Sequence, residues 1–167
     1  MADSVEVKTN HGNFTIELDA AKAPKSVTNF LAYVNDRHYD NTLFHRVIDG
    51  FMIQGGGFSP GMQQKPTRAP VAHEGANGLK NAKYTVAMAR TGDPHSATAQ
   101  FFINVGDNAF LDFKSPGGNG WGYTVFGKVV EGQDVVDKIK GVATARSGHH
   151  ENVPTSDVVI KSAELVG

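Results

Sequence analysis

The sequence contains no cysteine, and this absence excludes several kinds of protein. No disulfide can staple the fold, no thiolate can act as a nucleophile, and no zinc or iron–sulfur site can use cysteine ligands. Packing must therefore hold the chain together. Residues 1–6 also lack the basic start and apolar run of a secretory signal peptide. We expect a cytoplasmic protein, and the lack of cysteine is compatible with that reducing compartment.

An excess of charge of one sign is also missing. The chain has 16 Lys plus Arg and 17 Asp plus Glu, a formal net charge of -1. Nothing in this balance draws the chain to nucleic acid or to anionic lipid. No apolar run approaches the roughly 18 residues that a membrane helix needs. We therefore expect polypeptide or other neutral partners, and neither nucleic acid nor membrane.

The chain has 167 residues, without an internal repeat or a low-complexity tract. A chain of this size buries about 70% of its unfolded surface around one core. Glycine and proline are spread between short periodic runs and do not gather in a linker. We predict a single domain over residues 1–167 and, because no long exposed apolar stripe is apparent, a monomer.

Two segments have the spacing of helices. Residues Val27, Phe30, Leu31 and Val34 fall at i, i+3, i+4 and i+7, behind Pro24, which suits a first helical turn. Residues 133–140 place three apolar side chains on one face. The second helix is expected to end at Gly141, a residue that accepts the left-handed conformation of a C-cap.

The other apolar segments alternate or run continuously as strands do. The first two form an expected hairpin, residues 5–9 and 14–18, and six more strands follow at 42–47, 51–54, 84–90, 99–105, 123–130 and 157–165. Two helices cannot cover both faces of so large a sheet. Closure removes the exposed edges and leaves room for side chains inside. We predict an all-β-dominated fold, a closed eight-stranded antiparallel barrel capped by two α-helices.

Several short motifs match chemistries that their surroundings exclude. Residues 57–61 have the spacing of a hydrolase nucleophile elbow, but Pro60 lacks the backbone N–H that the oxyanion hole requires. The glycines at 55–57 and 117–122 do not continue into a phosphate-binding loop. His149 and His150, beside Glu151, point apart on an extended chain, and no third metal ligand is spaced nearby. We predict turns or solvated loops at all these places, and no metal site.

The pair Asp49-Gly50 predicts a hairpin turn, and the length of the connection decides which side chains share a face. A two-residue turn pairs Arg46 with Ile53. A three-residue connection sets Arg46 opposite Gln54, with Met52 alongside. Only the second arrangement brings an arginine, an amide and an apolar platform together. A lone arginine on a strand is more often a solvated charge on the outer wall.

Residues 44–58, Phe-His-Arg-Val-Ile-Asp-Gly-Phe-Met-Ile-Gln-Gly-Gly-Gly-Phe, closely resemble the signature of the cyclophilin family. Further matches follow in the same order at 78–81, 86–90, 96–104, 123–130 and 135–139. The resemblance covers essentially the whole chain. The short insertions and loop lengths are most similar to the compact bacterial cytosolic branch.

The resemblance implies a role for each matching residue. Arg46 matches the catalytic arginine. The expected pocket for the substrate proline consists of Phe51, Met52, Phe102 and Leu111. The expected border of the peptide groove consists of Gln54, Ala89, Arg90 and Gln100, and Phe110 and Tyr123 complete the substrate-binding set.

Three of these residues depart from the pattern of many eukaryotic members. Phe110 stands where a tryptophan is frequent, Tyr123 where a histidine is frequent, and Arg90 where an asparagine is frequent. Phenylalanine lacks the indole N–H donor. We therefore expect cyclosporin, a ligand typical of the family, to bind with weakened affinity. Because of Arg90, the family's preference for the residue before proline does not carry over to this chain.

The resemblance implies a peptidyl-prolyl cis-trans isomerase (EC 5.2.1.8) that acts on proline-containing peptides and on unfolded or folding proteins. No cofactor is expected, because rotation about an imide bond needs no nucleophile, metal or electron carrier. The alternative is a non-catalytic chaperone or scaffold module that grips proline-containing segments. Arg46 favours the enzyme, since a pure binder needs no donor at the imide nitrogen.

Overall fold

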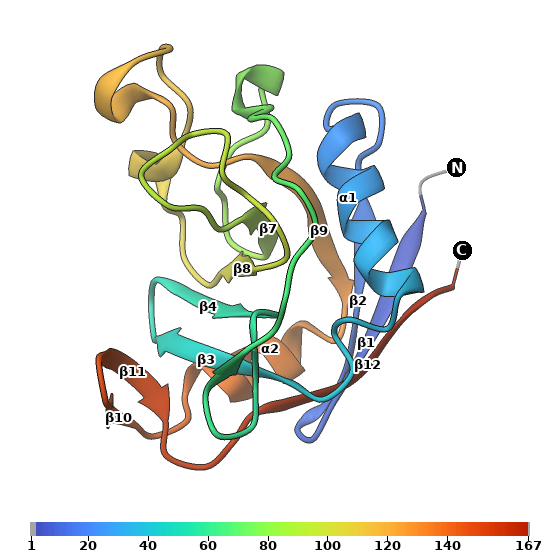
Figure 1. Cartoon of the computed structure of the whole chain (residues 1–167), viewed down its shortest axis with the longest axis vertical. Helices are drawn as coiled ribbons and strands as arrows, with labels where there is room; N and C mark the ends of the chain where they lie inside the picture. The colour runs from blue at the N-terminus through green and yellow to red at the C-terminus, as the bar shows by residue number, and fades with distance from the viewer. Residues whose placement is uncertain (1–2, 167) are drawn as a thin grey trace.

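The computed structural model describes residues 3–166, and within them it leaves the side chain of Asn119 undescribed. Eight antiparallel strands close into a barrel (Figure 1), as predicted from the sequence. Around the barrel they are β1 (Ser4–Thr9), β12 (Val159–Leu165), β3 (Thr42–Ile48), β4 (Met52–Gly55), β8 (Phe101–Asn104), β7 (Thr85–Met88), β9 (Val125–Glu131) and β2 (Gly12–Leu18).

The two ends of the chain complete the barrel. Strand β1 pairs with β2 along the predicted hairpin and, on its other side, with β12, so that Val5 lies opposite Leu165. Side chains of β1 alternate between buried and half-buried positions, as the period-two pattern predicts. This pairing leaves the barrel without an open edge.

Both predicted helices form, as α1 (Pro24–Asn35) and α2 (Gln133–Lys140), and both bury apolar residues in the core of the barrel. Pro24 lies in the first turn of α1. The predicted left-handed cap of α2 is wrong: Gly141 has φ -91°. The last turn of α2 instead tightens, because the N–H groups of Gly141 and Val142 donate to carbonyls three residues back.

A distant residue caps the N-terminus of α1. Ala23 precedes the helix and has no side chain that could cap it. The Glu74 carboxylate accepts hydrogen bonds from the backbone N–H groups of Lys25 and Ser26, at 3.2 and 2.7 Å. A negative charge at a helix N-terminus also interacts favourably with the positive end of the helix dipole. The loop that carries Glu74 is thereby tied to α1.

Four predicted strands are longer than the strands observed. The segments 84–90, 99–105, 123–130 and 157–165 lose residues at one or both ends. Tyr84 has φ 72°, outside the range of a strand. β7 ends at Met88, and beyond that end the side chain of Arg90 donates hydrogen bonds to the carbonyl of Gly122. Phe51, expected as the first residue of a strand, lies in the β3–β4 connection instead.

Two small hairpins lie outside the barrel, in segments where no strand was predicted. Strand β5 (Phe58–Ser59) pairs with β6 (Gln63–Gln64), and β10 (Thr144–Ser147) pairs with β11 (His150–Pro154). Strand β10 is exposed along its whole length and so shows no alternation of apolar residues. The prediction of a solvated loop at His150 is therefore wrong, since this residue begins β11 and is half-buried.

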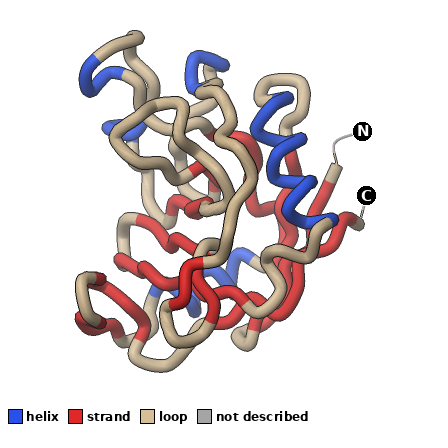
Figure 2. The backbone as a smooth tube through the Cα atoms, in the orientation of Figure 1, coloured by secondary structure: helices blue, strands red, loops and turns tan. Residues whose placement is uncertain are grey.

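Loops and three short 3-10 helices gather in the upper part of the molecule as drawn in Figure 2. The helices are η1 (Gly75–Asn77), η2 (Ala109–Leu111) and η3 (Gly118–Gly120). The loop before β7 meets the loop before η2 here, because the N–H of Asn108 donates to the carbonyl of Asn81 at 2.8 Å.

The strands β4, β8 and β7 are buried on both faces, and alternate residues enter two different apolar clusters. Ile53, Phe101 and Ile103 belong to the large cluster that fills the barrel. Met52 and Phe102 point the other way and belong to a smaller cluster on the outer wall. Because successive side chains of a strand alternate between faces, one apolar run supplies both the core and an outer platform.

Candidate active site

The connection between β3 and β4 has the longer of the two lengths that the sequence allowed. Ile48 pairs with Met52, and the N–H of Phe51 donates to the carbonyl of Ile48 at 3.0 Å. Gly50 adopts a positive φ of 81° in the turn. Arg46 therefore lies opposite Gln54, on the outer wall, as the three-residue connection predicts.

The pairing of β4 with β8 extends this platform. Gln54 lies opposite Phe102, and Phe102 lies opposite Ala87 on β7. A cavity of about 160 Å³ opens above these strands, lined by Arg46, Phe51, Met52, Gln54, Ala89, Arg90, Phe102, Leu111 and Tyr123. All nine residues belong to the substrate site that the resemblance implies.

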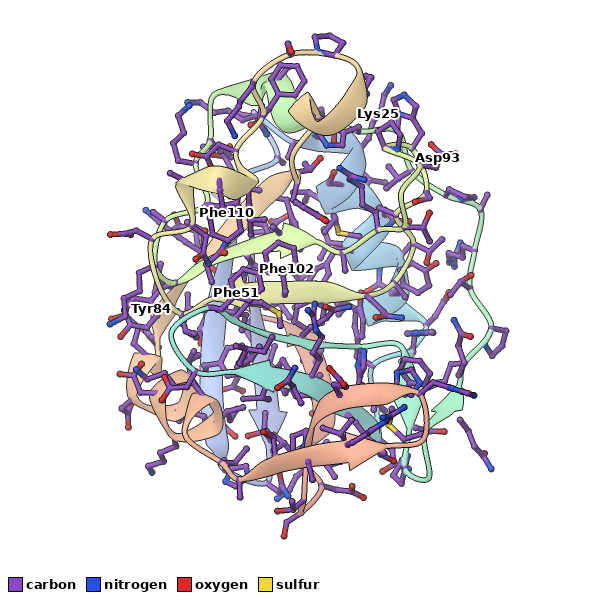
Figure 3. All side chains as sticks on the ribbon, turned by 90° about the vertical axis from the view of Figure 1, so that its left-hand side faces the viewer. Lys25, Phe51, Tyr84, Asp93, Phe102 and Phe110 are labelled. Carbon is purple, nitrogen blue, oxygen red and sulfur yellow. The ribbon has the colours of Figure 1, made fainter. Side chains whose placement is uncertain are left out.

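The two remaining residues of the expected site lie beside the cavity. Gln100 contacts Gln54 through a hydrogen bond of 2.9 Å. Phe110 is 65% exposed and stacks on Phe51, with ring centroids 5.7 Å apart. In Figure 3 Phe51, Phe102 and Phe110 lie close together on the face of the barrel turned to the viewer. The apolar surface thus continues from the cavity onto an exposed ledge.

Polar side chains at the rim of the cavity form a short row of hydrogen bonds. Arg46 Nη1 donates to Gln54 Oε1 at 3.4 Å, and Gln54 Nε2 donates to Gln100 Oε1 at 2.9 Å. Arg46 itself is exposed, and no carboxylate in residues 3–166 forms a salt bridge with it. Its remaining N–H donors are therefore available to a bound molecule.

Arg90, in contrast, is held by the protein. Its guanidinium donates twice to the carbonyl of Gly122, at 3.1 and 2.8 Å, and once to that of Thr91, at 2.8 Å. It also lies 4.5 Å from the centre of the Tyr123 ring, which meets Phe102 edge-on. Arg90 thus supports one wall of the cavity. The sequence offered no signal for this contact with the backbone of Gly122.

A larger hollow of about 690 Å³ lies on another side of the barrel, between β2, β9 and the loop before β7. Acidic residues such as Glu17 and Asp19 line it together with Lys80 and Lys128. Among the described residues that line it, none is aromatic, and Lys128 lies 3.9 Å from Glu17. The smaller cavity differs in its aromatic lining, which comes from Phe51, Phe102 and Tyr123.

The geometry was also compared with the serine-nucleophile and metal-binding motifs considered in the sequence. The Ser59 hydroxyl donates to the carbonyl of Gln63 at 3.2 Å, within the β5–β6 hairpin. In the part of the chain that the structure describes, no group of three or more His, Asp or Glu residues is placed to hold a metal ion. No helix between residues 3 and 166 is long and apolar enough to cross a bilayer.

His45, next to Arg46 on β3, is buried and lies against the two small hairpins outside the barrel. Its ring packs on Phe58 and lies 6.3 Å from the ring of His150, and its Nδ1 atom has no hydrogen-bond partner among the described residues. Burial, and then the nearby His150 and Arg46, lower the pKa of His45 from 6.5 to about 4. The folded protein therefore keeps this ring neutral.

This low pKa predicts a loss of stability in acid. The unfolded chain protonates His45 at about pH 6.5 and the folded chain only at about pH 4, so the contribution of His45 to stability is complete above pH 6.5 and is lost as the pH falls to 4. The loss from His45 is up to about 3 kcal/mol. The free energy of unfolding, measured by urea titration from pH 7.5 to 4, should depend less on pH in His45→Leu than in the wild type. Replacing the exposed His149 should leave this pH dependence unchanged. An unchanged pH dependence in His45→Leu would contradict the assignment.

Comparison with known proteins agrees with the geometry. The family described as cyclophilin type peptidyl-prolyl cis-trans isomerase/CLD matches residues 4–165. A peptidyl-prolyl cis-trans isomerase of Streptomyces antibioticus is 64% identical over 98% of this chain and 99% of its own length. Peptidyl-prolyl cis-trans isomerase B of Escherichia coli K12 is 61% identical over 96% of this chain and 98% of its own length.

Solved structures agree as well. A cyclophilin-type peptidyl-prolyl cis-trans isomerase of Cryptosporidium parvum superposes with a TM-score of 0.79 at 26% identity, covering 100% of this chain and 99% of that one. The same protein in the presence of the dipeptide Ala-Pro gives a TM-score of 0.77, covering 98% and 99%. The chain belongs to the cyclophilin-type peptidyl-prolyl cis-trans isomerase family.

Proposed function

We propose that this isomerase accelerates rotation about X-Pro bonds without covalent chemistry, with Arg46 as the catalytic donor. One observation carries the proposal. An exposed arginine with free donors stands at the rim of a small cavity lined by Phe51, Met52 and Phe102. A volume of about 160 Å³ is below the roughly 300–1,000 Å³ of sites for drug-sized ligands, and so suits one small ring.

Amide resonance explains what such a site has to do. The partial double bond gives rotation a barrier of about 18–20 kcal/mol, and the uncatalysed X-Pro event takes roughly tens to hundreds of seconds. In the twisted transition state the proline nitrogen regains its lone pair. A donor directed at that nitrogen binds the transition state better than the planar ground state and so lowers the barrier.

The neighbours of Arg46 support this role. Gln54 accepts from one N–H of the guanidinium and is itself held by Gln100, which limits the orientations of Arg46. The apolar walls would hold the proline ring and exclude water, which strengthens the polar contact. An acceleration on the order of 10⁵-fold requires roughly 7 kcal/mol, a reasonable sum for one directed donor plus orientation.

The test is the cis-to-trans relaxation of a short X-Pro peptide, followed by NMR exchange with and without the protein. We expect the exchange rate to rise in proportion to enzyme concentration. Binding of the peptide without faster exchange would instead support the non-catalytic chaperone or scaffold module.

Finer properties belong to the same proposal. The partners would be proline-containing peptides and unfolded or folding proteins, met in the cytoplasm by a monomer. Among the described residues, the exposed large apolar side chains are Phe110, Val130, Leu165 and Val166, and they form no long stripe. Phe110 offers cyclosporin an exposed ring without an N–H donor, so we expect weakened affinity.

A further inference from the structure

Three buried asparagines lie against the outer cluster that forms the cavity. Asn81 precedes β7, Asn104 ends β8, and Asn108 precedes η2. Their exposed fractions are 1%, 0% and 4%. Asparagine is mostly exposed in proteins, so three buried together need an explanation.

The three amides form one continuous chain of hydrogen bonds. Asn108 Nδ2 donates to Asn104 Oδ1 at 2.8 Å, and Asn104 Nδ2 donates to Asn81 Oδ1 at 3.1 Å. A second hydrogen of Asn104 Nδ2 is accepted by the Thr85 hydroxyl at 3.0 Å. Every donor of Asn104 is therefore used, and its oxygen has a partner.

Both ends of this chain reach the backbone of residues that line the cavity. At one end, Asn108 Nδ2 donates to the carbonyl of Phe51 at 2.8 Å. At the other end, Asn81 Nδ2 has three acceptors within hydrogen-bond distance: the carbonyls of Leu111 and Tyr123, at 3.1 and 3.4 Å, and the Asp112 carboxylate, at 3.2 Å. These three carbonyls belong to the β3–β4 connection, to η2 and to the segment before β9.

The position of Asn104 explains how the chain reaches all three segments. Asn104 lies opposite Met52 and two residues beyond Phe102, so its side chain shares the outer face with the floor of the cavity. From there it faces Asn108 on one side and Asn81 on the other. A buried amide that loses its partner is costly, so the three side chains favour one arrangement.

We propose that Asn81, Asn104 and Asn108 are positioning residues that set the separation between the Phe51 wall and the Leu111–Tyr123 wall, and thereby the affinity for the proline ring. The inference rests on the proposed function, since it concerns the same cavity. Two sets of residues would then have different roles in the cavity. The asparagine chain holds the walls, whereas Gln54 and Gln100 orient Arg46, and no hydrogen bond of the described residues joins the two groups.

Asn108→Ala tests the proposed role in holding the walls, because it removes the side-chain hydrogen bond to the Phe51 carbonyl without touching the cavity lining. In NMR exchange measurements with an X-Pro peptide, KM should rise roughly fivefold or more while kcat changes by less than about twofold. A residue that served stability alone would leave both constants unchanged at a temperature where the variant is folded.

Thr85→Val is the matched control. It is nearly isosteric and removes an acceptor from the same Asn104 amide, but on a branch that leads to no cavity carbonyl. It should lower the free energy of unfolding and leave KM within about twofold of wild type. A rise in KM as large as that of Asn108→Ala would overturn the inference, because the effect would then follow stability.

Asn108→Ser replaces Asn108→Ala in the KM measurement if the alanine variant does not fold. The shorter hydroxyl side chain can donate only one hydrogen bond, so KM should still rise at least about twofold. A folded variant with the KM of wild type overturns the inference. This result would differ from a failure of the proposed function, in which the wild-type protein itself would not accelerate exchange.

Discussion

Arg46→Ala should lower kcat/KM for an X-Pro peptide at least about tenfold, equivalent to roughly 1.4 kcal/mol of transition-state stabilisation. The loss should fall mainly on kcat, because the guanidinium is proposed to bind the twisted nitrogen and not the planar ground state. Arg46 is exposed and makes one long hydrogen bond of 3.4 Å within the protein. Its removal should therefore change the free energy of unfolding by less than about 0.5 kcal/mol.

Two controls sharpen the Arg46 measurement. Lys128→Ala removes another exposed cation from the outer wall, on β9, and should leave kcat/KM unchanged. Arg46→Lys keeps the charge but loses the planar set of donors, so it should recover only part of the activity. An Arg46→Ala variant that is folded and turns over at the wild-type rate would refute the assignment.

Phe102→Ala should have the second-largest effect, and it should act on both binding and stability. Phe102 is 4% exposed and its ring centroid lies 5.6 Å from that of Tyr123, so truncation removes part of the cavity floor and leaves a void. A buried phenylalanine changed to alanine costs about 3–5 kcal/mol. KM should rise strongly in the protein that remains folded, and unfolding must be measured before the kinetics.

The neighbouring residue offers a matched control for Phe102. Phe101 is equally buried but points into the barrel, where it meets Phe30 and Tyr39 edge-on. The milder pair Phe102→Leu and Phe101→Leu should lose similar stability, while only Phe102→Leu raises KM. Equal effects of the two substitutions on KM would mean that Phe102 acts through general packing and not through contact with substrate.

Much of the fold could be predicted from local patterns. The spacing behind Pro24 predicts α1, and the alternation at residues 5–9 predicts β1, because each pattern follows from the geometry of one element. The hairpins β5–β6 and β10–β11 could not be predicted. Strand β10 is wholly exposed, so it lacks the apolar alternation on which such a prediction depends.

The candidate site also has features that could be predicted from the sequence and features that could not. The resemblance names the residues that line the cavity, but residue spacing alone left two registers open for Arg46. The contacts of Arg90 with Gly122, of Glu74 with α1, and of Asn108 with Phe51 had no local signal. Each joins segments that lie more than 30 residues apart in the chain, and no periodic pattern records such a contact.

The sequence by itself determined the two α-helices, the eight barrel strands in their order and the absence of thiol chemistry, because periodicity and composition are local properties of the chain. It also placed Arg46 beside an Asp-Gly turn. Only the tertiary structure decided that the turn takes the longer connection, that β1 and β12 close the barrel, and that Met52 and Phe102 face outward together. Register and strand pairing depend on contacts between distant segments, and a shift of one residue would have turned Arg46 to the opposite face.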